Sequence, residues 1–381
     1  MIKRLLYNKL KSSPKSILLI GPRQSGKSTL LLSLNPNIEV NLADESEFIK
    51  ISSDPDRFRS LIEDKKYIFV DEVQRIPSLL NTIQVIIDES LRKRKPILFL
   101  LSGSSARKLK RGQANLLPGR IFTYNIAGLS ARELNYKVDF YKALSHGFLP
   151  EPYLEKDTDT AEKLLQSYSH SYLKEEIQAE ALTRNLQGFM RFLNIMAGSS
   201  GEILDFSKVS TKAKVSRSSI IRFVEILEDT LIGYRVPVFE KAKSADTIKH
   251  PKFYFFDPGV LNGLLDNFTV SKDRLGFLVE HLVFAQLQNS AMALDEKIEI
   301  TYFRTRHNIE VDFIIFWRKK YYAIEVKSTE ITKADLSSLK RFKEYFPSVE
   351  RLFAVSLKET NRTLDGVTIC GINELLQHLK M

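Results

Sequence analysis

The chain has 381 residues, of which 43% are hydrophobic, and a formal net charge of +11 at pH 7. This length predicts two to four domains. The single cysteine, Cys370, excludes a disulfide within the chain and, with no apolar leader at the start, favours the cytoplasm. The longest apolar runs, such as residues 97–101, are too short to cross a bilayer. The positive charge suggests a polyanionic partner, nucleic acid first, although many basic proteins bind none.

Residues 21–28 form a complete phosphate-binding loop, G-x-x-x-x-G-K-[ST], directly after a strand predicted at 16–20. We expect Lys27 to reach the β- and γ-phosphates of ATP and Ser28 to ligate Mg²⁺. Gly21 and Gly26 are expected to adopt positive φ angles that aim backbone N–H groups inward. A helix predicted at 29–34 would present its positive end to the phosphates; the alternative is a flexible glycine turn. The residues expected to bind the nucleotide are Gly21, Pro22, Arg23, Gln24, Ser25, Gly26, Lys27, Ser28 and Thr29.

A second strand is predicted at 38–42, and two adjacent carboxylates, Asp71 and Glu72, end the apolar strand predicted after it at 66–72. Following a phosphate loop, this pattern predicts a Walker B motif, in which Asp71 holds the Mg²⁺ water shell and Glu72 polarises the attacking water. The next strand, predicted at 96–101, is followed by Ser102 and Ser104. In P-loop ATPases with an inserted central strand, that strand lies between the other two. We therefore expect these hydroxyls to touch the γ-phosphate or the water, with a Ser/Gly turn as the alternative.

Arg120 precedes a strand predicted at 121–124. An arginine at this point would stabilise transition-state charge, in cis or on a neighbouring subunit's nucleotide, and a plain surface arginine is the alternative. Two basic runs lie nearby. Residues 92–95 are expected in a solvated loop, and residues 107–111 either line a subunit interface, contact phosphates or are solvated as well.

The middle of the chain has helical patterns. Residues 127 to about 167 predict a small helical lid, and 162–186 a long polar helix. Residues 203–239 then predict a helix, a turn and a second helix that starts at Ser216, a good N-cap. With strands predicted at 234–238 and 252–256 as a wing, this pattern is typical of a winged helix. Such a domain contacts DNA or only protein, and both alternatives stay open.

Three segments near the C-terminus predict a second site. Glu280 lies within the apolar stripe of a helix predicted at 274–288, where an unpaired carboxylate would be costly. Asp312 lies on a strand predicted at 310–316, and Glu325 and Lys327 share one face of the next strand. This arrangement predicts Mg²⁺ or Mn²⁺ held by Glu280, Asp312 and Glu325, with Lys327 orienting or deprotonating the attacking water. The alternative is a salt-bridged hairpin.

These motifs resemble AAA+-like ATPases of bacteria and archaea with a C-terminal PD-(D/E)xK, or restriction-endonuclease-like, domain. The resemblance rests on residues 21–28, 69–74, 101–105, 118–120, 253–259, 302–305, 310–313 and 324–327. It implies an ATPase core, a winged-helix linker and a nuclease-like domain. The chain departs from the RecB-like nuclease pattern, because no Gln-x-x-x-Tyr helix follows Lys327.

We therefore expect an α/β protein with four domains. These are a P-loop ATPase core of the AAA+/ASCE class with a parallel sheet (1–126), a helical lid and linker helix (127–185), a winged helix (186–258) and an α/β restriction-endonuclease-like domain (259–381). The expected function is ATP- and Mg²⁺-dependent action on branched or broken DNA as a homo-oligomer, a ring or a dimer. The alternative is a regulatory, signal-transduction-type ATPase whose nuclease-like domain binds DNA or partners without cutting.

Overall fold

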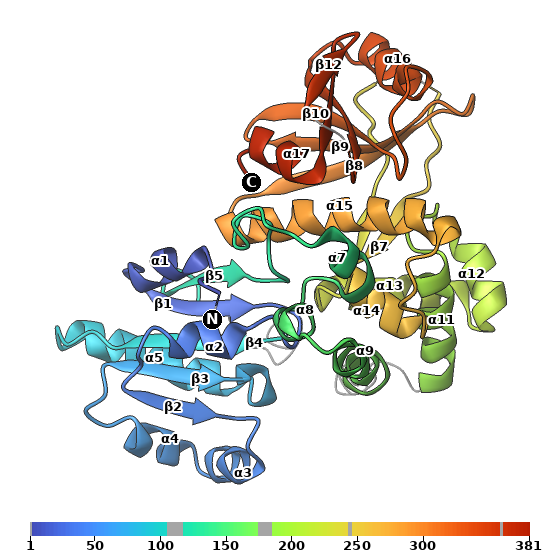
Figure 1. Ribbon diagram of the computed structural model, residues 1–381. Coiled ribbons are helices and arrows are strands. Elements are labelled where there is room, and N and C mark those ends of the chain that lie inside the picture. The colour runs from blue at the N-terminus through green and yellow to red at the C-terminus, as the bar shows by residue number, and fades with distance from the viewer. Residues whose placement is uncertain (1, 105–116, 174–184, 243–245, 359–360) are drawn as a thin grey trace. The chain divides into compact units, whose positions relative to one another are not determined.

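The computed structural model describes residues 2–104, 117–173, 185–242, 246–358 and 361–381 (Figure 1). It divides into two compact units. The N-terminal unit runs to residue 127 and includes the short segments 229–231 and 292–295, and the C-terminal unit contains the rest. The boundary predicted at 126/127 lies one residue from this division, whereas those predicted at 185/186 and 258/259 fall inside the C-terminal unit and stay predictions. Within the described ranges, no helix is both long and apolar enough to span a membrane.

The N-terminal unit is built around a five-stranded sheet in the order β2-β3-β4-β1-β5, with every neighbouring pair parallel. The strand β4 lies between β1 and β3, as the sequence predicted. The elements of this unit are α1 (Leu6–Lys11), β1 (Ser16–Ile20), α2 (Lys27–Leu32), β2 (Ile38–Asn41), α3 (Glu45–Ser53), α4 (Pro55–Leu61), β3 (Tyr67–Asp71), the 3₁₀ turn η1 (Val73–Arg75), α5 (Leu79–Arg92), β4 (Leu98–Gly103) and β5 (Ile121–Asn125).

Both faces of this sheet are covered by helices, which explains why its central strands β1, β3 and β4 are continuous apolar runs rather than alternating ones. Leu18 and Ile20 of β1 pack on one face with residues of α3, α4 and α5. Ile17 and Leu19 pack on the other face with α1 and α2. The carboxyl ends of the parallel strands therefore meet at one edge, which is where the phosphate loop and Asp71 lie.

The first part of the C-terminal unit is mainly helical. Its elements are α7 (Phe140–His146), α8 (Pro150–Leu154), α9 (Thr158–Ser167), the π-helical turn η2 (Tyr168–Tyr172), α11 (Leu186–Gly198), α12 (Phe206–Ala213), α13 (Arg217–Asp229), β6 (Gly233–Val236), β7 (Lys252–Phe255) and α14 (Pro258–Leu264). The strands β6 and β7 form an antiparallel pair, and Lys252 of β7 also bridges to Ile203. Phe189, Phe192 and Phe223 of α11 and α13 pack against one another, with ring centroids 4.8 to 5.5 Å apart.

The second part of this unit is a six-stranded mixed sheet in the order β12-β13-β11-β10-β9-β8. Neighbours β8, β9 and β10 are antiparallel, while β10 and β11 are parallel. In chain order the elements are α15 (Lys272–Leu294), β8 (Ile298–Arg304), β9 (Glu310–Trp317), β10 (Lys320–Val326), the 3₁₀ turn η3 (Ala334–Leu336), α16 (Ser337–Tyr345), β11 (Val349–Ser356), β12 (Arg362–Leu364), β13 (Val367–Gly371) and α17 (Ile372–His378).

The long helix α15 lies along this sheet (Figure 1). Phe284 of α15 stacks on Tyr254 of β7 at 4.5 Å and lies 6.3 Å from Phe313 of β9, between ring centroids. The strand β7, the helix α15 and the strand β9 therefore share one aromatic contact. This contact brings the strand predicted as a wing next to the strand that carries Asp312.

Candidate functional sites

The phosphate loop joins β1 to α2. Its two glycines, Gly21 and Gly26, are required for different reasons. Gly26 has φ +87° and precedes the first helical residue, so it takes the positive φ expected of it. Gly21 is not among the residues with positive φ, which corrects the expectation for this position. A β-carbon there would lie 2.2 Å from the carbonyl oxygen of Ile126, so close packing, not backbone freedom, requires the glycine.

Lys27 is buried and folds back over its own loop. Its ammonium donates to the carbonyl oxygens of Gly21 and Pro22, both at 2.9 Å. These neutral acceptors hold the cation at the mouth of the loop. Phosphate oxygens, being anionic, would form stronger bonds with the same group.

Asp71 connects the loop to the neighbouring strands. Its Oδ2 accepts from the Ser28 hydroxyl at 2.7 Å, and its Oδ1 accepts from the Ser102 hydroxyl. The Ser102 oxygen in turn accepts from the backbone N–H of Glu72 at 3.1 Å. The structure thus brings together the side chains that the sequence assigned separately to Walker A, Walker B and the central strand.

Glu72 has a left-handed backbone, with φ +55°, which is costly for a residue with a side chain and occurs preferentially at functional sites. Gln74 donates from Nε2 to the Glu72 carboxylate and to the Ser104 hydroxyl, the latter at 3.0 Å. Sequence reasoning assigned no role to Gln74, although it lies two residues after Glu72 in a quoted motif. The signal available in the sequence was a polar side chain two residues after Glu72.

These residues fit a nucleotide with its Mg²⁺. Six polar side chains at this edge of the sheet are buried without an apolar reason to be so: Ser25, Lys27, Asp71, Gln74, Ser102 and Ser104. Lys27 offers a cation for phosphate, and Asp71 with the half-buried Ser28 offers a carboxylate and a hydroxyl for the metal. Gln74 and Ser104 offer hydrogen-bonding groups beside Glu72. The arrangement is one that phosphoryl transfer to water requires.

Arg120 lies elsewhere. It precedes β5, whose first residue Ile121 pairs with Ser16, whereas the phosphate loop follows the other end of β1. Its guanidinium pairs with the carboxylate of Asp88 on α5 at 3.0 and 3.2 Å. The cis alternative is therefore corrected, because strand register places Arg120 at the opposite edge of the sheet. A role on a neighbour's nucleotide stays a proposal.

The two basic runs differ in what the structure describes. Residues 92–95 are exposed between α5 and β4, as expected of a solvated run. Residues 107–111 lie outside the described residues. Much of the long helix predicted at 162–186 also falls there; its described start divides into α9 and η2.

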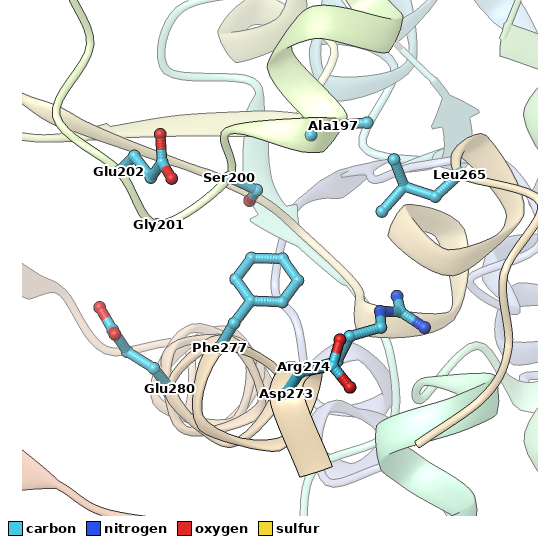
Figure 2. Close-up of a pocket in the computed structure, with 10 residues that line it drawn as sticks. Ala197, Ser200, Gly201, Glu202, Leu265, Asp273, Arg274, Phe277 and Glu280 are labelled. Carbon is cyan, nitrogen blue, oxygen red and sulfur yellow. The ribbon is translucent and has the colours of Figure 1, made fainter. Parts of the chain in front are cut away.

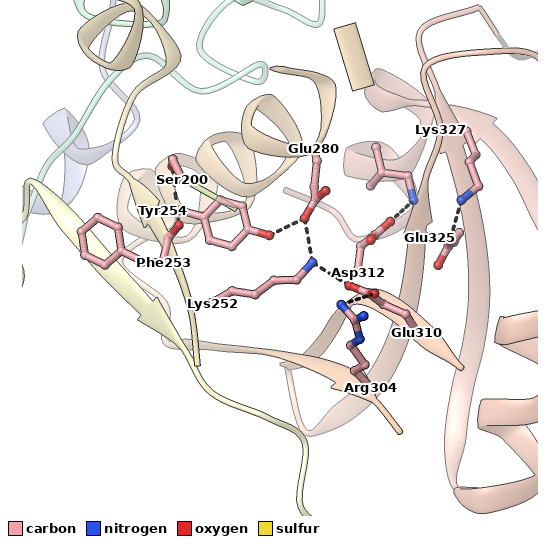
Figure 3. A network of polar contacts seen from close by, with 11 residues as sticks. Ser200, Lys252, Phe253, Tyr254, Glu280, Arg304, Glu310, Asp312, Glu325 and Lys327 are labelled. Carbon is pink, nitrogen blue, oxygen red and sulfur yellow. Dashed lines mark hydrogen bonds and ion pairs between the residues drawn. The ribbon is translucent and has the colours of Figure 1, made fainter. Parts of the chain in front are cut away.

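The second candidate site lies in the C-terminal unit, where β9 and β10 run side by side (Figure 3). Asp312 of β9 accepts at Oδ2 from the backbone N–H of Val326 at 2.7 Å. Glu325 at the end of β10 is buried, and its Oε1 accepts from the Lys327 ammonium at 2.6 Å. Its other oxygen, Oε2, is buried and has no hydrogen-bond partner among the described residues. Asp312, Glu325 and Lys327 thus come together as predicted.

Burial dominates the electrostatics of this cluster. It raises the pKa of Asp312 well above its ordinary value, and the charges of Glu325 and Glu280 add to the effect. Burial also raises the pKa of Glu325, against the lowering by Lys327. Carboxyl groups this close together are costly to ionise without nearby cations.

Glu280 turns to partners that were not predicted. Its Oε1 accepts from the Lys252 ammonium at 3.1 Å and from the Tyr254 hydroxyl, both on β7. Among the described residues, no group of three or more His, Cys, Asp or Glu side chains is arranged to hold a metal ion. The predicted ligand set of Glu280, Asp312 and Glu325 is therefore not assembled, because Glu280 pairs with β7 instead.

Lys252 is the residue that sequence reasoning missed. It is buried, lies 3.0 Å from Glu310 Oε1, and Glu310 pairs in turn with Arg304 at 3.1 Å. Burial alone would lower the pKa of Lys252, but the carboxylates of Glu280, Asp312 and Glu310 raise it. The signal in the sequence was a single lysine directly before the aromatic residues 253–256. A lysine among residues expected to be buried needs an acidic partner.

Glu280 also lines a pocket of about 430 Å³ between the end of α11 and the first turns of α15 (Figure 2). Phe277, Arg274 and Asp273 line it from α15, and Ser200 and Glu202 from the turn after α11. Arg274 is already bonded to Asn262 and to the carbonyls of Asn267 and Thr269. The pocket therefore gives solvent access to the Glu280 side of the cluster, while its one arginine is engaged elsewhere.

A basic face lies on α12, α13 and the turn between them. Its exposed cations are Lys208, Lys212, Lys214, Arg217 and Arg222. Ser216 caps the turn, with its hydroxyl accepting from the N–H of Ser219 at 3.2 Å. The exposed cations at the start of α13 are thus held in a defined turn.

Comparisons with known proteins divide the chain in a similar way. An AAA domain family matches residues 13–135, and two families, each described as a Domain of unknown function (DUF8612 and DUF4143), match residues 137–271 and 275–375. Uncharacterized proteins of Mycobacterium tuberculosis and Mycobacterium bovis are each 24% identical over 317 residues, covering 82% of this chain and 70% of the relative.

Similar solved structures include RuvB of Thermotoga maritima, at 15% identity and a TM-score of 0.32, covering 63% of this chain and 90% of that one. The Aeropyrum pernix ORC1 protein in complex with DNA is 10% identical with a TM-score of 0.32, covering 69% and 89%. TM-scores of 0.32 are too low to indicate a shared fold. The match to the AAA domain family covers the part of the chain that contains the phosphate loop, Ser28 and Asp71.

Proposed function

We propose that this protein hydrolyses ATP and uses the nucleotide cycle, as a homo-oligomer, to act on branched or broken DNA. The observation that carries the ATPase part is the hydrogen bond between Ser28 and Asp71, which joins Walker A to Walker B across the sheet edge. Ser102 joins the central strand to the same carboxylate.

The residues divide the work of hydrolysis. Lys27 holds the phosphates, and Ser28 with Asp71 would hold Mg²⁺ and its water shell, where the metal supplies charge neutralisation. Glu72 orients and polarises the attacking water, and Gln74 with Ser104 positions the Glu72 carboxylate. Each group would act from a position that the fold has already fixed.

The DNA-binding part is supported by α11 to β7. The succession of α11, the bridge at Ile203, α12, α13, β6 and β7 is the order of elements in a winged helix, and its exposed lysines and arginines would contact phosphates. The succession α15-β8-β9-β10-α16-β11, with carboxyl groups on β9 and β10, supports a restriction-endonuclease-like fold. Because its carboxylates do not form a metal-ligand set, we propose that this fold contacts DNA and assign it no cleavage step.

The second candidate function is a regulatory ATPase in which nucleotide state changes assembly or partner binding. The pairing of Glu280 with Lys252 favours it, because a carboxylate neutralised by a lysine is better suited to a site that binds DNA or a partner than to one that cleaves DNA. The two candidates differ in whether DNA changes the rate of ATP hydrolysis.

The DNA-binding proposal is tested by fluorescence anisotropy with duplex, forked and four-way DNA. Reversing the charge of Lys212, Lys214 and Arg217 together should weaken binding at least about tenfold and reduce its salt dependence, since fewer counterions are released. Reversing the exposed Lys137, Lys156 and Lys163, outside this face, is the matched control and should change affinity much less. Equal losses in both variants would contradict a specific DNA-binding face.

A further inference from the structure

The carboxylate cluster of the C-terminal unit already contains a cation. Lys252 enters it from β7, its side chain is only 5% exposed, and its ammonium lies 3.1 Å from Glu280 and 3.0 Å from Glu310 (Figure 3). These carboxylates come from α15 and β9, far from Lys252 in the chain. A buried lysine is stable only when paired in this way, so the fold around β7, α15 and β9 is organised about this cation.

The remaining carboxyl groups are engaged unequally. Asp312 accepts from the Val326 N–H, and one oxygen of Glu325 accepts from Lys327. The other oxygen of Glu325 is buried, and the part of the chain that the structure describes gives it no hydrogen-bond partner. This orphaned acceptor marks a position where a cation or a water would be stabilised, and the pocket beside Glu280 gives solvent a way toward the cluster.

We infer that the ammonium of Lys252 is the resident cation of this cluster and keeps a divalent ion from binding to Asp312 and Glu325. The inference rests on the restriction-endonuclease-like reading of the fold. A divalent ion beside Asp312 would be repelled by Lys252, and Glu280 could not serve as a ligand while it is paired with that lysine. Only withdrawal of Lys252 would open the cluster to a metal.

Lys252 has a fixed place at the start of the strand β7. Its backbone is held by pairing with Val236 of β6 and by the bridge to Ile203, just before α12. The same strand therefore joins the basic face of α12 and α13 to the carboxylate cluster.

The test is a Mn²⁺ titration of the nucleotide-free full chain, followed by electron paramagnetic resonance. Lys252→Gln keeps the length and a hydrogen-bond donor but removes the charge. It should gain one Mn²⁺ site at least tenfold tighter than any Asp312-dependent site in the wild type, and adding Asp312→Asn should abolish it. Lys252→Arg keeps the charge and should behave as the wild type. Lys320→Gln removes an exposed lysine paired with Glu350 on the same sheet, and it should gain nothing.

Two results would overturn the inference: a wild-type protein that binds Mn²⁺ through Asp312 as tightly as Lys252→Gln does, or a folded Lys252→Gln that gains no site. If Lys252→Gln does not fold by circular dichroism, the wild type and Asp312→Asn decide. Equal Mn²⁺ binding supports the inference, and loss of a tight site in Asp312→Asn contradicts it. The titration reads neither DNA affinity nor ATP turnover, so failure of the proposed function leaves its outcome intact.

Discussion

Two buried lysines, Lys27 in the phosphate loop and Lys252 in the carboxylate cluster, differ in the acceptors that they contact. Lys27 donates to neutral carbonyl oxygens of the loop, whereas Lys252 lies between two carboxylates. Exchange of a carbonyl for a phosphate oxygen strengthens the bond to the cation, whereas exchange of a carboxylate does not. The first site is therefore prepared for an anionic ligand, whereas the second is already neutralised by the protein itself.

The largest expected effects lie at the first site. Lys27→Ala should abolish ATP binding, because it removes the phosphate-binding cation. Glu72→Gln should bind ATP but hydrolyse it at least about a hundredfold more slowly, because the amide cannot polarise the water. Nucleotide affinity by equilibrium dialysis and turnover by phosphate release separate the two effects. Turnover at the parental rate in Glu72→Gln would remove the Walker B assignment.

The carboxylate cluster is formed by one chain. A variant of Arg120 tests whether the nucleotide site, in contrast, is completed by a second chain. If Arg120 acts in trans, Arg120→Ala should slow hydrolysis about a thousandfold and keep ATP affinity. Mixing it with Lys27→Ala protein should restore part of the rate. The control is Asp88→Asn, which breaks the ion pair but keeps the arginine. A protein that stays monomeric with ATP, or equal small effects of both variants, would remove the trans proposal.

Asp257 tests how firmly the segment between β7 and α14 is anchored. Its carboxylate accepts from the N–H groups of Phe148, Gly259 and Val260, and burial raises its pKa to about 6. A raised acid pKa means that the folded state binds the proton more tightly. This group's contribution is thus fully present below about pH 4 and is lost as the pH rises through 6, by about 3 kcal/mol.

The measurement is urea unfolding of the wild type and Asp257→Asn between pH 4 and 7. As the pH rises, the unfolding free energy of the wild type should fall relative to that of Asp257→Asn, because only the wild type loses a proton at this position. A difference that stays constant over this range would show that Asp257 does not titrate there.

The smallest effect is expected from Gln74, which links Glu72 to Ser104. Gln74→Ala should lower kcat about tenfold with little change in KM, because the general base loses its positioning contact. Ser104→Ala should act similarly, and the double variant should cost little more than either, since both belong to one hydrogen-bond network. Fully additive losses would mean that the two side chains act independently.

The two sites also differ in how well the sequence predicts them. The phosphate loop is one contiguous motif, and Asp71 and Ser102 follow strands whose carboxyl ends must meet at one edge of a parallel sheet. Their contacts could therefore be predicted, whereas the packing of Gly21 against Ile126 could not, because it depends on the path of a distant segment.

In the carboxylate cluster the hairpin of β9 and β10 is local, so Asp312, Glu325 and Lys327 could be placed together. The position of Glu280 depends on a lysine in another part of the chain, brought close by the packing of Tyr254 on Phe284. The same limit explains Arg120, whose nearness in sequence to a strand start does not reveal which edge of the sheet it occupies until the register is known.

The central claim, that ATP hydrolysis is linked to DNA, is tested most directly by the rate of phosphate release with and without duplex, forked and four-way DNA. The account predicts that DNA raises the rate, most with branched DNA. It also predicts that charge reversal at Lys212, Lys214 and Arg217 removes the stimulation but leaves the basal rate. A rate that is the same with every DNA and without any would contradict the claim and favour the regulatory ATPase.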